Sequence, residues 1–433
     1  MTGMRGLAGL ILSGFLSWTG PVAADAVVDW NEITMTAVTA GRPGPPGTID
    51  MALVHVAVHD AVQAIDRRFE PYHVEIKGAK GSRSAAVAAA AHDVLVGLYP
   101  AQAATLDAAY FNYLADKGLT GDPGLAVGQK VAAGILPLRR AAPDPLPPPF
   151  IGGTGPGMWR PTESFLPGAP PSFAPMAAPW LANLDPLTLT SPTRFRVPPP
   201  PALTSSQYRR DFEEVKAMGA FASTSRSPAQ TDLAHFYSEN FFTQWNRALR
   251  GIAERYLHRT GDSARLFALA NLALADAVIS AWDSKRFYFF WRPMTAIREA
   301  GNDGNPGTVA DPNWQSLLNN PNYPDYTSGA NVVAASMTRT LEQFFGTDRV
   351  TFEVTSVAPL ANRKTRTYRR FSDAAQDMVN ARVYAGIHFR FADEAGRNQG
   401  TRVAEWVFDH FLLPLDDHGH RGPCKHKGDG HQH

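Results

Sequence analysis

The chain contains a single cysteine, Cys424, among its 433 residues. One cysteine cannot form a disulfide within the chain, so the fold must be held by other interactions. A chain of this length with 44% hydrophobic residues can bury a core that is large enough without cross-links. Cys424 also lies in a polar tail, where a catalytic nucleophile would be poorly held. The sequence therefore excludes a disulfide-rich scaffold.

An excess of charge of either sign is also missing. The chain has 41 basic and 40 acidic residues, which gives a formal net charge of +1. This balance argues against binding to nucleic acid or to a membrane surface through bulk charge. Any site for an anion must therefore be built locally.

Long apolar runs are scarce as well. The run from Leu7 to Leu16 is too short to span a bilayer, and no other segment reads as a membrane span. Arg5 precedes this run and Val22-Ala23-Ala24 follows it, a pattern typical of an export signal. We predict a signal peptide over residues 1–24 and a secreted or periplasmic protein. The alternative is a disordered or buried N-terminal helix.

Helical periodicity dominates the remaining chain, and no alternating pattern typical of strands stands out. The sequence predicts an all-α fold, with residues 25–413 forming one helical domain. Helices are expected at 49–65, 84–98, 101–116, 124–139, 205–218, 227–242, 245–256, 263–298 (with a possible break near Ser280), 328–345, 373–389 and 396–412.

Two segments lack this periodicity. Residues 141–204 are too long for a turn and too rich in proline for a sheet, but they contain Trp159, Phe165, Phe173 and Trp180. We expect this proline-rich segment to wrap over the surface as ordered irregular chain. Residues 414–433 contain five histidines among Gly, Asp and Lys and are expected to form a flexible tail, with metal capture as the weaker alternative.

Lys285 and Arg292 flank a run of five aromatic residues, Phe287 to Trp291. On a helix, a spacing of seven residues places the two side chains about 20° apart. Unpaired cations in apolar surroundings are costly, so two that converge there call for an anion. The alternative is a solvated helix face.

Two other pairs of residues suit the same purpose. Ser328 is a candidate N-cap, and Gly329 leaves a backbone N–H open at the start of a helix, where anions are favoured. Arg382 and His388, about 120° apart on a helix, could line one pocket, and Gly386 between them permits close approach. Each feature alone is also compatible with an ordinary capped helix or a core histidine.

Together, Lys-x6-Arg-Pro, Ser-Gly before a helix and Arg-x5-His resemble the vanadium-dependent haloperoxidases and the related type 2 phosphatidic-acid and bacterial acid phosphatases. The resemblance extends over most of residues 27–412, and it is closer to the haloperoxidases at Arg42-Pro43, 53–66, 265–293 and 386–389. It implies an all-helical fold of two bundle-like halves that binds vanadate, for which phosphate is a structural mimic.

The resemblance also implies a role for each residue. His388 would bond to vanadium, and Lys285, Arg292 and Arg382 would neutralise the oxyanion. Ser328 and the Gly329 N–H would hydrogen-bond to it. Trp282 and Tyr323 match positions beside the halide region, and Glu239 loosely matches an acid that pairs with the arginine at position 382.

One departure from the family pattern bears on activity. Ala330 stands where the family has a histidine that serves as general acid and base, and alanine can transfer no proton. Thr327 replaces a proline, and Asp393 follows His388 by five residues, whereas the phosphatase pattern has four. Loss of general acid–base help costs about 10²–10⁴-fold in rate.

Three functions are therefore open. The first is a haloperoxidase-like enzyme, impaired by Ala330, that uses hydrogen peroxide to oxidise bromide or iodide rather than chloride; its partners would be hydrogen peroxide and a halide or a small organic substrate. The second is an acid phosphatase with His388 as nucleophile. The third is a non-catalytic protein that binds phosphate or vanadate.

His55 and His59 lie one helical turn apart and could suggest a metal pair. The neighbouring Asp60 points elsewhere on the helix, and no other acidic or cysteine ligand stands at a suitable spacing. We predict packing or hydrogen-bonding roles for both.

Overall fold

The computed structural model of the chain describes residues 25–142, 146–164 and 172–416. The predicted signal peptide, Phe165, Cys424 and most of the histidine-rich tail lie outside the described residues. Thirteen α-helices occupy most of the described chain and confirm the all-α prediction. They are α1 (Ala26–Gly41), α2 (Gly47–Asp66), α3 (Arg83–Leu98), α4 (Ala103–Asp116), α5 (Gly124–Ile135), α6 (Ser206–Met218), α7 (Pro228–Phe236), α8 (Phe241–Tyr256), α9 (Thr260–Tyr288), α10 (Pro293–Arg298), α11 (Gly329–Phe345), α12 (Phe371–Tyr384) and α13 (Arg390–His410).

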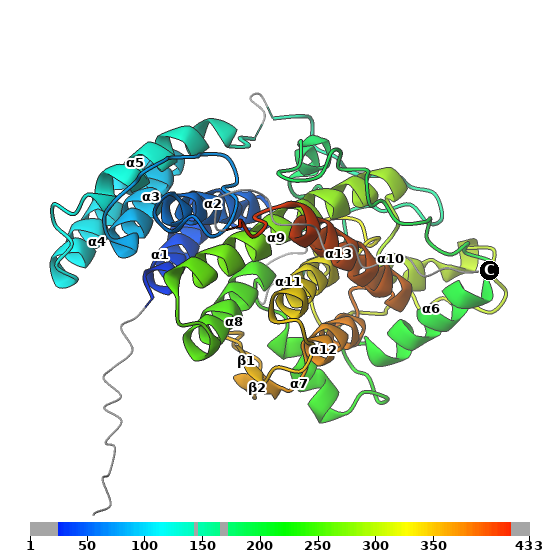
Figure 1. Cartoon of the computed structure of the whole chain (residues 1–433). Coiled ribbons are helices and arrows are strands. Elements are labelled where there is room, and N and C mark those ends of the chain that lie inside the picture. The colour runs from blue at the N-terminus through cyan, green and yellow to red at the C-terminus, as the bar shows by residue number, and fades with distance from the viewer. Residues whose placement is uncertain (1–24, 143–145, 165–171, 417–433) are drawn as a thin grey trace, which may run out of the picture.

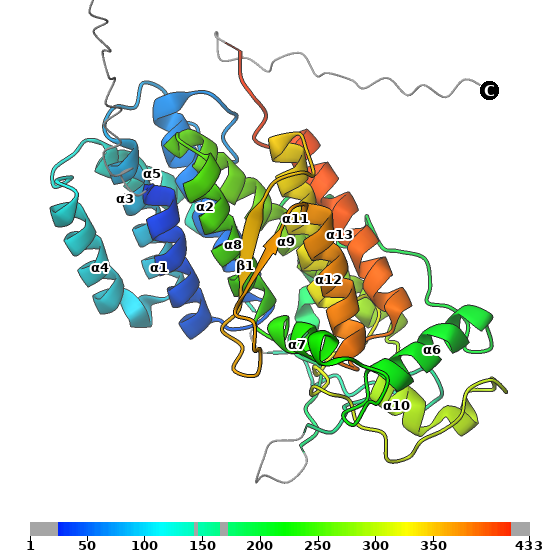
Figure 2. The same ribbon diagram turned by 90° about the horizontal axis from the view of Figure 1, so that it is seen from below.

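Helix α9 is the central element of the fold. It packs against α2 on one side and against α11 and α13 on the other. Figures 1 and 2 show α1–α5 gathered at one end of the molecule, α11–α13 on the other side of α9, and α6 and α10 beyond them at the opposite end. By length and composition α9 could cross a membrane, but its apolar stretch is entirely buried inside the protein. An apolar helix that is enclosed on all sides in this way is typical of the centre of a large core.

Several helices end or begin at other residues than predicted: α7 ends at Phe236 rather than at 242, and α13 begins at Arg390 rather than at 396. Two further differences concern the predicted site. No break occurs near Ser280: α9 continues to Tyr288 and ends where Phe289 takes a left-handed conformation, with φ of 30°. Helix α12 ends at Tyr384, five residues before the predicted end at 389. Gly386, with φ of 77°, then turns the chain, so His388 lies in the connection to α13 and not on a helix.

One helix and one β-hairpin were not predicted. Helix α1 begins after Asp25, whose carboxylate accepts the Val27 N–H. Strands β1 (Phe352–Thr355) and β2 (Thr365–Tyr368) form an antiparallel pair in which Phe352 faces Tyr368. This hairpin is small beside the helices and leaves the all-α class unchanged.

The proline-rich segment wraps over the surface in its described parts, as predicted. Trp159 is fully buried, and its main-chain N–H donates to the Phe289 carbonyl at 2.7 Å. The buried carboxylate of Asp276 on α9 accepts the N–H groups of residues 187, 188 and 189 at distances of 2.7–3.1 Å. Phe173, by contrast, is exposed. These contacts attach the proline-rich segment to the central helix.

Candidate oxyanion site

Lys285 lies in the last turn of α9 and is fully buried. Its ammonium donates to the main-chain carbonyls of Pro324 at 2.6 Å and Asp325 at 3.1 Å. It also lies 4.8 Å from the centre of the Tyr323 ring. These contacts use two of its three N–H donors, and the third is left for another acceptor.

Arg292 is also fully buried, but it lies beyond the end of α9, directly before α10. The helical spacing of seven residues therefore does not explain why it meets Lys285. The two meet because both bind the same irregular stretch: Arg292 Nε donates to the Tyr323 carbonyl at 2.8 Å. Its Nη1 donates to the Ile387 carbonyl at 2.6 Å and lies 3.0 Å from His388 Nε2.

His388 is buried and lies between a cation and a carboxylate. Its Nδ1 is 2.7 Å from Oδ1 of Asp325, and Arg292 Nη1 is 3.6 Å from the same oxygen. Asp325 is itself fully buried. Arg292 Nη1 also lies 3.3 Å from Nδ1, so the guanidinium faces both ring nitrogens of His388, while Asp325 lies beside Nδ1.

The N-terminus of α11 completes this region. Ser328 occupies the N-cap position, but its side chain makes no capping hydrogen bond to the first turn. A Cβ on Gly329 would lie 3.6 Å from Trp282 and 4.0 Å from Lys285 Cε, so the helix begins against these side chains. The N–H groups of its first turn give this end a partial positive charge.

Arg382 lies on α12 and donates from Nη1 to the Tyr237 carbonyl at 3.1 Å. It does not pair with Glu239. The Glu239 carboxylate binds Arg247 at 2.7 Å and accepts the Val357 N–H at 2.9 Å. The expected pairing of Glu239 with Arg382 is therefore wrong, because Arg247, on the adjoining helix α8, already satisfies this acid.

The two aromatic residues predicted beside the halide region do lie together. The ring centres of Trp282 and Tyr323 are 5.0 Å apart. Trp282 Nε1 donates to the carbonyl of Ala177 at 3.0 Å, and the Ala177 N–H donates to the Asn322 carbonyl at 2.9 Å. The proline-rich segment therefore borders the site beside these two rings.

Burial and mutual repulsion perturb the cations of the site. Burial, followed by the charge of Arg292, holds the pKa of Lys285 well below its usual value. The pKa of His388 is also well below its usual value, because of burial and the charges of Arg292, Lys285 and Arg382. The imidazole is therefore neutral at neutral pH. The charges of Lys285, Arg292 and Arg382, called the cationic cluster below, would be relieved by an anion.

Two buried carboxylates oppose these charges. Burial raises the pKa of Asp325 to about 7, although Arg292 and Lys285 act against the rise. Burial also raises the pKa of Asp393 well above its usual value. Asp393 Oδ1 accepts a hydrogen bond from Asn331 Nδ2 at 2.7 Å, and the same amide donates to Ser328 Oγ at 3.1 Å.

The sequence predicted no role in the site for Asp325 or Asn331. Asp325 reads as a turn residue in Tyr-Pro-Asp-Tyr, and Asn331 as an ordinary first-turn residue. The proximity of Asp325 to Ser328-Gly329 along the chain was the available signal. A carboxylate so close to a predicted anion site is a conflict that calls for an explanation.

The donor set of the cationic cluster suits a tetrahedral oxyanion such as phosphate or vanadate. Arg292 Nη2 and Arg382 Nε are buried and have no hydrogen-bond partner within the described chain. Buried guanidinium donors are seldom left unpaired, and their planar geometry matches oxyanion oxygens. The uncapped start of α11 adds backbone donors. The residues present therefore fit the group that the resemblance implies.

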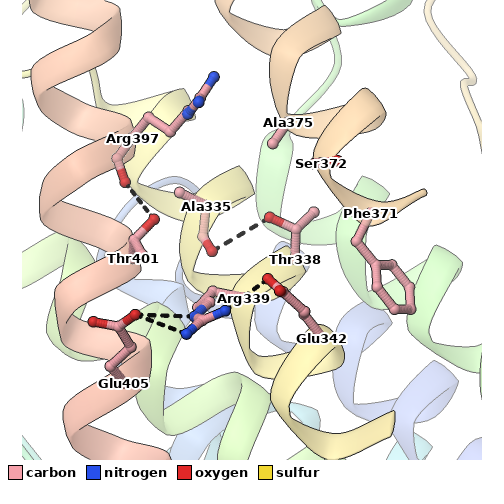
Figure 3. A pocket seen from close by; sticks show the side chains of 10 residues that line it. All are labelled: Ala335, Thr338, Arg339, Glu342, Phe371, Ser372, Ala375, Arg397, Thr401 and Glu405. Atoms are coloured by element: carbon pink, nitrogen blue, oxygen red, sulfur yellow. Dashed lines mark hydrogen bonds and ion pairs between the residues drawn. The ribbon is translucent and has the colours of Figure 1, made fainter. Parts of the chain in front are cut away.

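A cavity of about 350 Å³ lies away from the cationic cluster, between α11, α12 and α13 (Figure 3). Within it Arg339 is paired with Glu342 at 2.8 Å and with Glu405 at 2.9 Å. No residue of the cationic cluster lines it. Arg339 is thus neutralised, whereas Arg397, which also lines this cavity, donates to the neutral side-chain amide of Gln376 at 2.6 Å.

Comparisons with known proteins agree with this geometry. Residues 265–416 match the family model described as the VCPO second helical-bundle domain. The chain is 24% identical to the vanadium chloroperoxidase of Curvularia inaequalis over 488 aligned positions, which cover 86% of this chain and 80% of that protein. The chain is therefore similar to the vanadium haloperoxidases in its second helical bundle and, at low identity, over most of its length. The family match includes Lys285, Arg292, Ser328, Arg382 and His388 within its bounds.

Solved structures from this family have the same fold. A bacterial vanadium-dependent iodoperoxidase superposes with a TM-score of 0.74 at 23% identity, covering 90% of this chain and 97% of that one. The apo form of a bacterial vanadium-dependent chloroperoxidase gives 0.69 at 18% identity, covering 85% and 95%. The family fold thus spans nearly the whole described chain, including the N-terminal helices outside the family match.

Proposed function

We propose that this chain is a vanadate-dependent haloperoxidase-like protein that oxidises bromide or iodide with hydrogen peroxide. One observation carries the proposal: Lys285, Arg292 and His388 come from three separate segments and meet, fully enclosed, around residues 323–325. The relatives named above, a chloroperoxidase and an iodoperoxidase, support this chemistry.

The protein's own residues would hold the oxyanion and exclude water from it. The free donors of Lys285, Arg292 and Arg382 would bind its oxygens, and the first turn of α11 would bind another. His388 would present a ring nitrogen to the central atom. When bound, vanadate would supply the activation of peroxide for halide oxidation. Trp282 and Tyr323 would form the apolar wall against which the halide lies.

Proton transfer is the weak point of this site. Ala330 occupies the first turn of α11 and is almost completely buried, so no side chain at this position can move a proton. This observation favours a second candidate, a phosphate- or vanadate-binding protein with little turnover. Iodide and bromide are easier to oxidise than chloride, so they suit a site with reduced acid–base help.

The decisive experiment is to load the protein with vanadate and measure oxidation of bromide and iodide, for the wild type and for Ala330→His. We expect slow iodide or bromide oxidation that rises about 10²–10⁴-fold in the variant. The matched control is His388→Ala, which should abolish the reaction in either background. Vanadate binding without oxidation in both proteins would establish the binding-only function. Phosphate release from p-nitrophenyl phosphate would instead identify a phosphatase.

A further inference from the structure

We propose that Gln399 is a positioning residue that holds the first turn of α11 at a fixed place relative to Lys285, so that both can bind the same oxyanion. The inference rests on the proposed oxyanion function. It assigns a role to a side chain of α13 whose hydrogen bonds, among the described residues, all go to atoms outside the cationic cluster.

The side-chain amide of Gln399 is fully buried and joins α13 to two other parts of the site. Its Oε1 accepts a hydrogen bond from Thr327 Oγ1 at 2.7 Å, and Thr327 directly precedes Ser328, the N-cap residue of α11. Its Nε2 donates to Ser284 Oγ at 3.0 Å, and Ser284 directly precedes Lys285 on α9. One side chain therefore connects the residue before the start of α11 with the residue before the buried lysine.

The neighbours of this amide fix which of its two ends is the oxygen. Nε2 faces the main-chain carbonyls of Ser280 at 3.1 Å and of Phe195 at 3.3 Å, and a carbonyl can only accept. Ser284 Oγ donates its own hydrogen to the Ser280 carbonyl at 3.1 Å, so it can accept from Nε2. Oε1 is then left to accept from Thr327 Oγ1. The orientation of the amide is therefore determined by groups from α9, the proline-rich segment and the residue before Ser328.

Close packing makes the start of α11 follow α13. A Cβ on Gly396 would lie 2.6 Å from the Ser328 carbonyl oxygen, and a Cβ on Gly400 would lie 2.2 Å from the Val332 carbonyl oxygen. The two helices therefore touch main chain to main chain on either side of the glutamine. Because this glutamine also bonds to α9, a shift of α13 relative to α9 would carry the first turn of α11 away from the lysine.

Lys285 cannot set this separation alone. Its ammonium bonds to the carbonyls of Pro324 and Asp325, but a lysine side chain is flexible and can follow these carbonyls if residues 323–328 move. Thr327 stands where the family pattern has a proline, so its bond to Gln399 is a feature of this chain. Donors that bind one anion together must be held in a fixed geometry by supporting side chains.

The test is the dissociation constant of inorganic phosphate, measured calorimetrically on the full chain. Thr327→Val keeps the shape of the side chain and removes only the hydroxyl that binds Gln399. We expect the dissociation constant to rise about 2–10-fold, because the loss of one hydrogen bond lowers the population of the binding-competent arrangement by this factor. Thr327→Ser keeps the hydroxyl and should bind phosphate like the wild type. A dissociation constant unaltered by Thr327→Val would overturn the inference, and a wild type that binds no phosphate would overturn the proposed function instead.

Thr340→Val is the matched control for a general loss of stability. Thr340 is also buried and also lies on α11, but its hydroxyl donates to the Ser336 carbonyl at 2.8 Å. It stands about 16 Å along the helix from Gly329. The free energy of unfolding can fall in both valine variants, but only Thr327→Val should weaken phosphate binding. An equal change of the dissociation constant in the control would assign the effect to stability and overturn the inference.

A double variant tests the pairing itself. Gln399→Leu should raise the phosphate dissociation constant about 10–100-fold, because the bonds to both α9 and Thr327 are lost. Adding Thr327→Val to Gln399→Leu should cause no further rise, because the hydroxyl has no partner left to lose. Effects that multiply in the double variant would show that the two side chains act separately, which overturns the inference. If Gln399→Leu fails to fold, the three threonine variants still decide.

Discussion

At the scale of single residues, the site depends on buried charges that few other positions of a protein would tolerate. The sequence predicted the members of the cationic cluster only because three motifs together resemble a known family; each motif alone also fits a solvated helix face, a capped helix or a core histidine. It could not predict Asp325, because the cost of burying a carboxylate depends on neighbours contributed by other segments. The pairing of Glu239 failed for the same reason: Arg247 is nearer in space.

Lys285→Met should weaken phosphate binding about 10–100-fold, because a charged hydrogen bond in a buried site contributes about 1.5–3 kcal/mol. Thermal unfolding measures this directly, since saturation at about 100 times the dissociation constant stabilises the folded state by about 2.7 kcal/mol. The melting temperature of the wild type should therefore rise with phosphate much more than that of the variant. Lys130→Met, at an exposed position on α5, is the control and should respond like the wild type. An equal response of Lys285→Met would remove this lysine from the site.

At the scale of elements, the ends of helices place the chemistry. Helix interiors followed from periodicity, but the end of α9 did not, because the aromatic run through Trp291 continues the helical pattern. Tertiary hydrogen bonds end the helix. The Phe289 carbonyl accepts a hydrogen bond from the main-chain N–H of Trp159, and the Phe290 carbonyl accepts one from that of Asp325, both distant in sequence. The hairpin β1–β2 was missed because four alternating residues per strand give too weak a signal.

Gly386→Ala should destabilise the protein much more than Gly346→Ala. Both glycines have positive φ, 77° and 68°, so an added Cβ costs about 1–2 kcal/mol of backbone strain at either position. Only at Gly386 would the Cβ also collide, 2.3 Å from the Gly219 carbonyl oxygen, whereas nothing lies within 4 Å at Gly346. Overpacking adds about 1–3 kcal/mol.

Urea unfolding at one pH gives the free energy of unfolding for the wild type and both variants. The variant at position 386 should also bind phosphate less tightly, because His388 is two residues away. Equal losses of stability in the two variants would show that the collision with Gly219 is relieved by movement of the loop.

At the scale of the whole molecule, a buried polar network joins the N-terminal helices to the centre. Asn31 of α1 donates to His55 of α2 at 2.8 Å and to Asn246 of α8 at 2.9 Å. Asn246 also exchanges hydrogen bonds with Asn271 of α9. His55 thus has the hydrogen-bonding role that the sequence predicted. The network itself was beyond prediction, because its members come from four helices.

This network should make the protein sensitive to acid. Burial, and then the charge of Arg250, lowers the pKa of His55 to about 3. The unfolded chain binds a proton near pH 6.5 and the folded chain does not, so stability falls as the pH drops from about 6.5 toward 3. At pH 5 this one group should cost about 2 kcal/mol. Urea unfolding at pH 7 and pH 5 measures the difference.

His55→Gln should reduce that difference, because glutamine keeps an acceptor for Asn31 and does not titrate. The free energy of unfolding of the variant at pH 7 can differ from that of the wild type without affecting the test. The test compares only how much this free energy falls between pH 7 and pH 5. His258→Gln, at an exposed position, is the matched control and should keep the full acid sensitivity of the wild type. A pH dependence unaltered by His55→Gln would place the acid-labile group elsewhere.

The carboxylate of Asp276 also limits how the length of this chain can vary. It lies nine residues before Lys285 on one unbroken helix, which separates the two by about 13.5 Å and about half a turn. Inserting or deleting one residue between them would rotate one by about 100° relative to the other. Either Asp276 would no longer reach the N–H groups of residues 187–189, or Lys285 would no longer reach the proposed anion site. Changes in length should therefore be tolerated in the proline-rich segment itself but rejected within this stretch of α9.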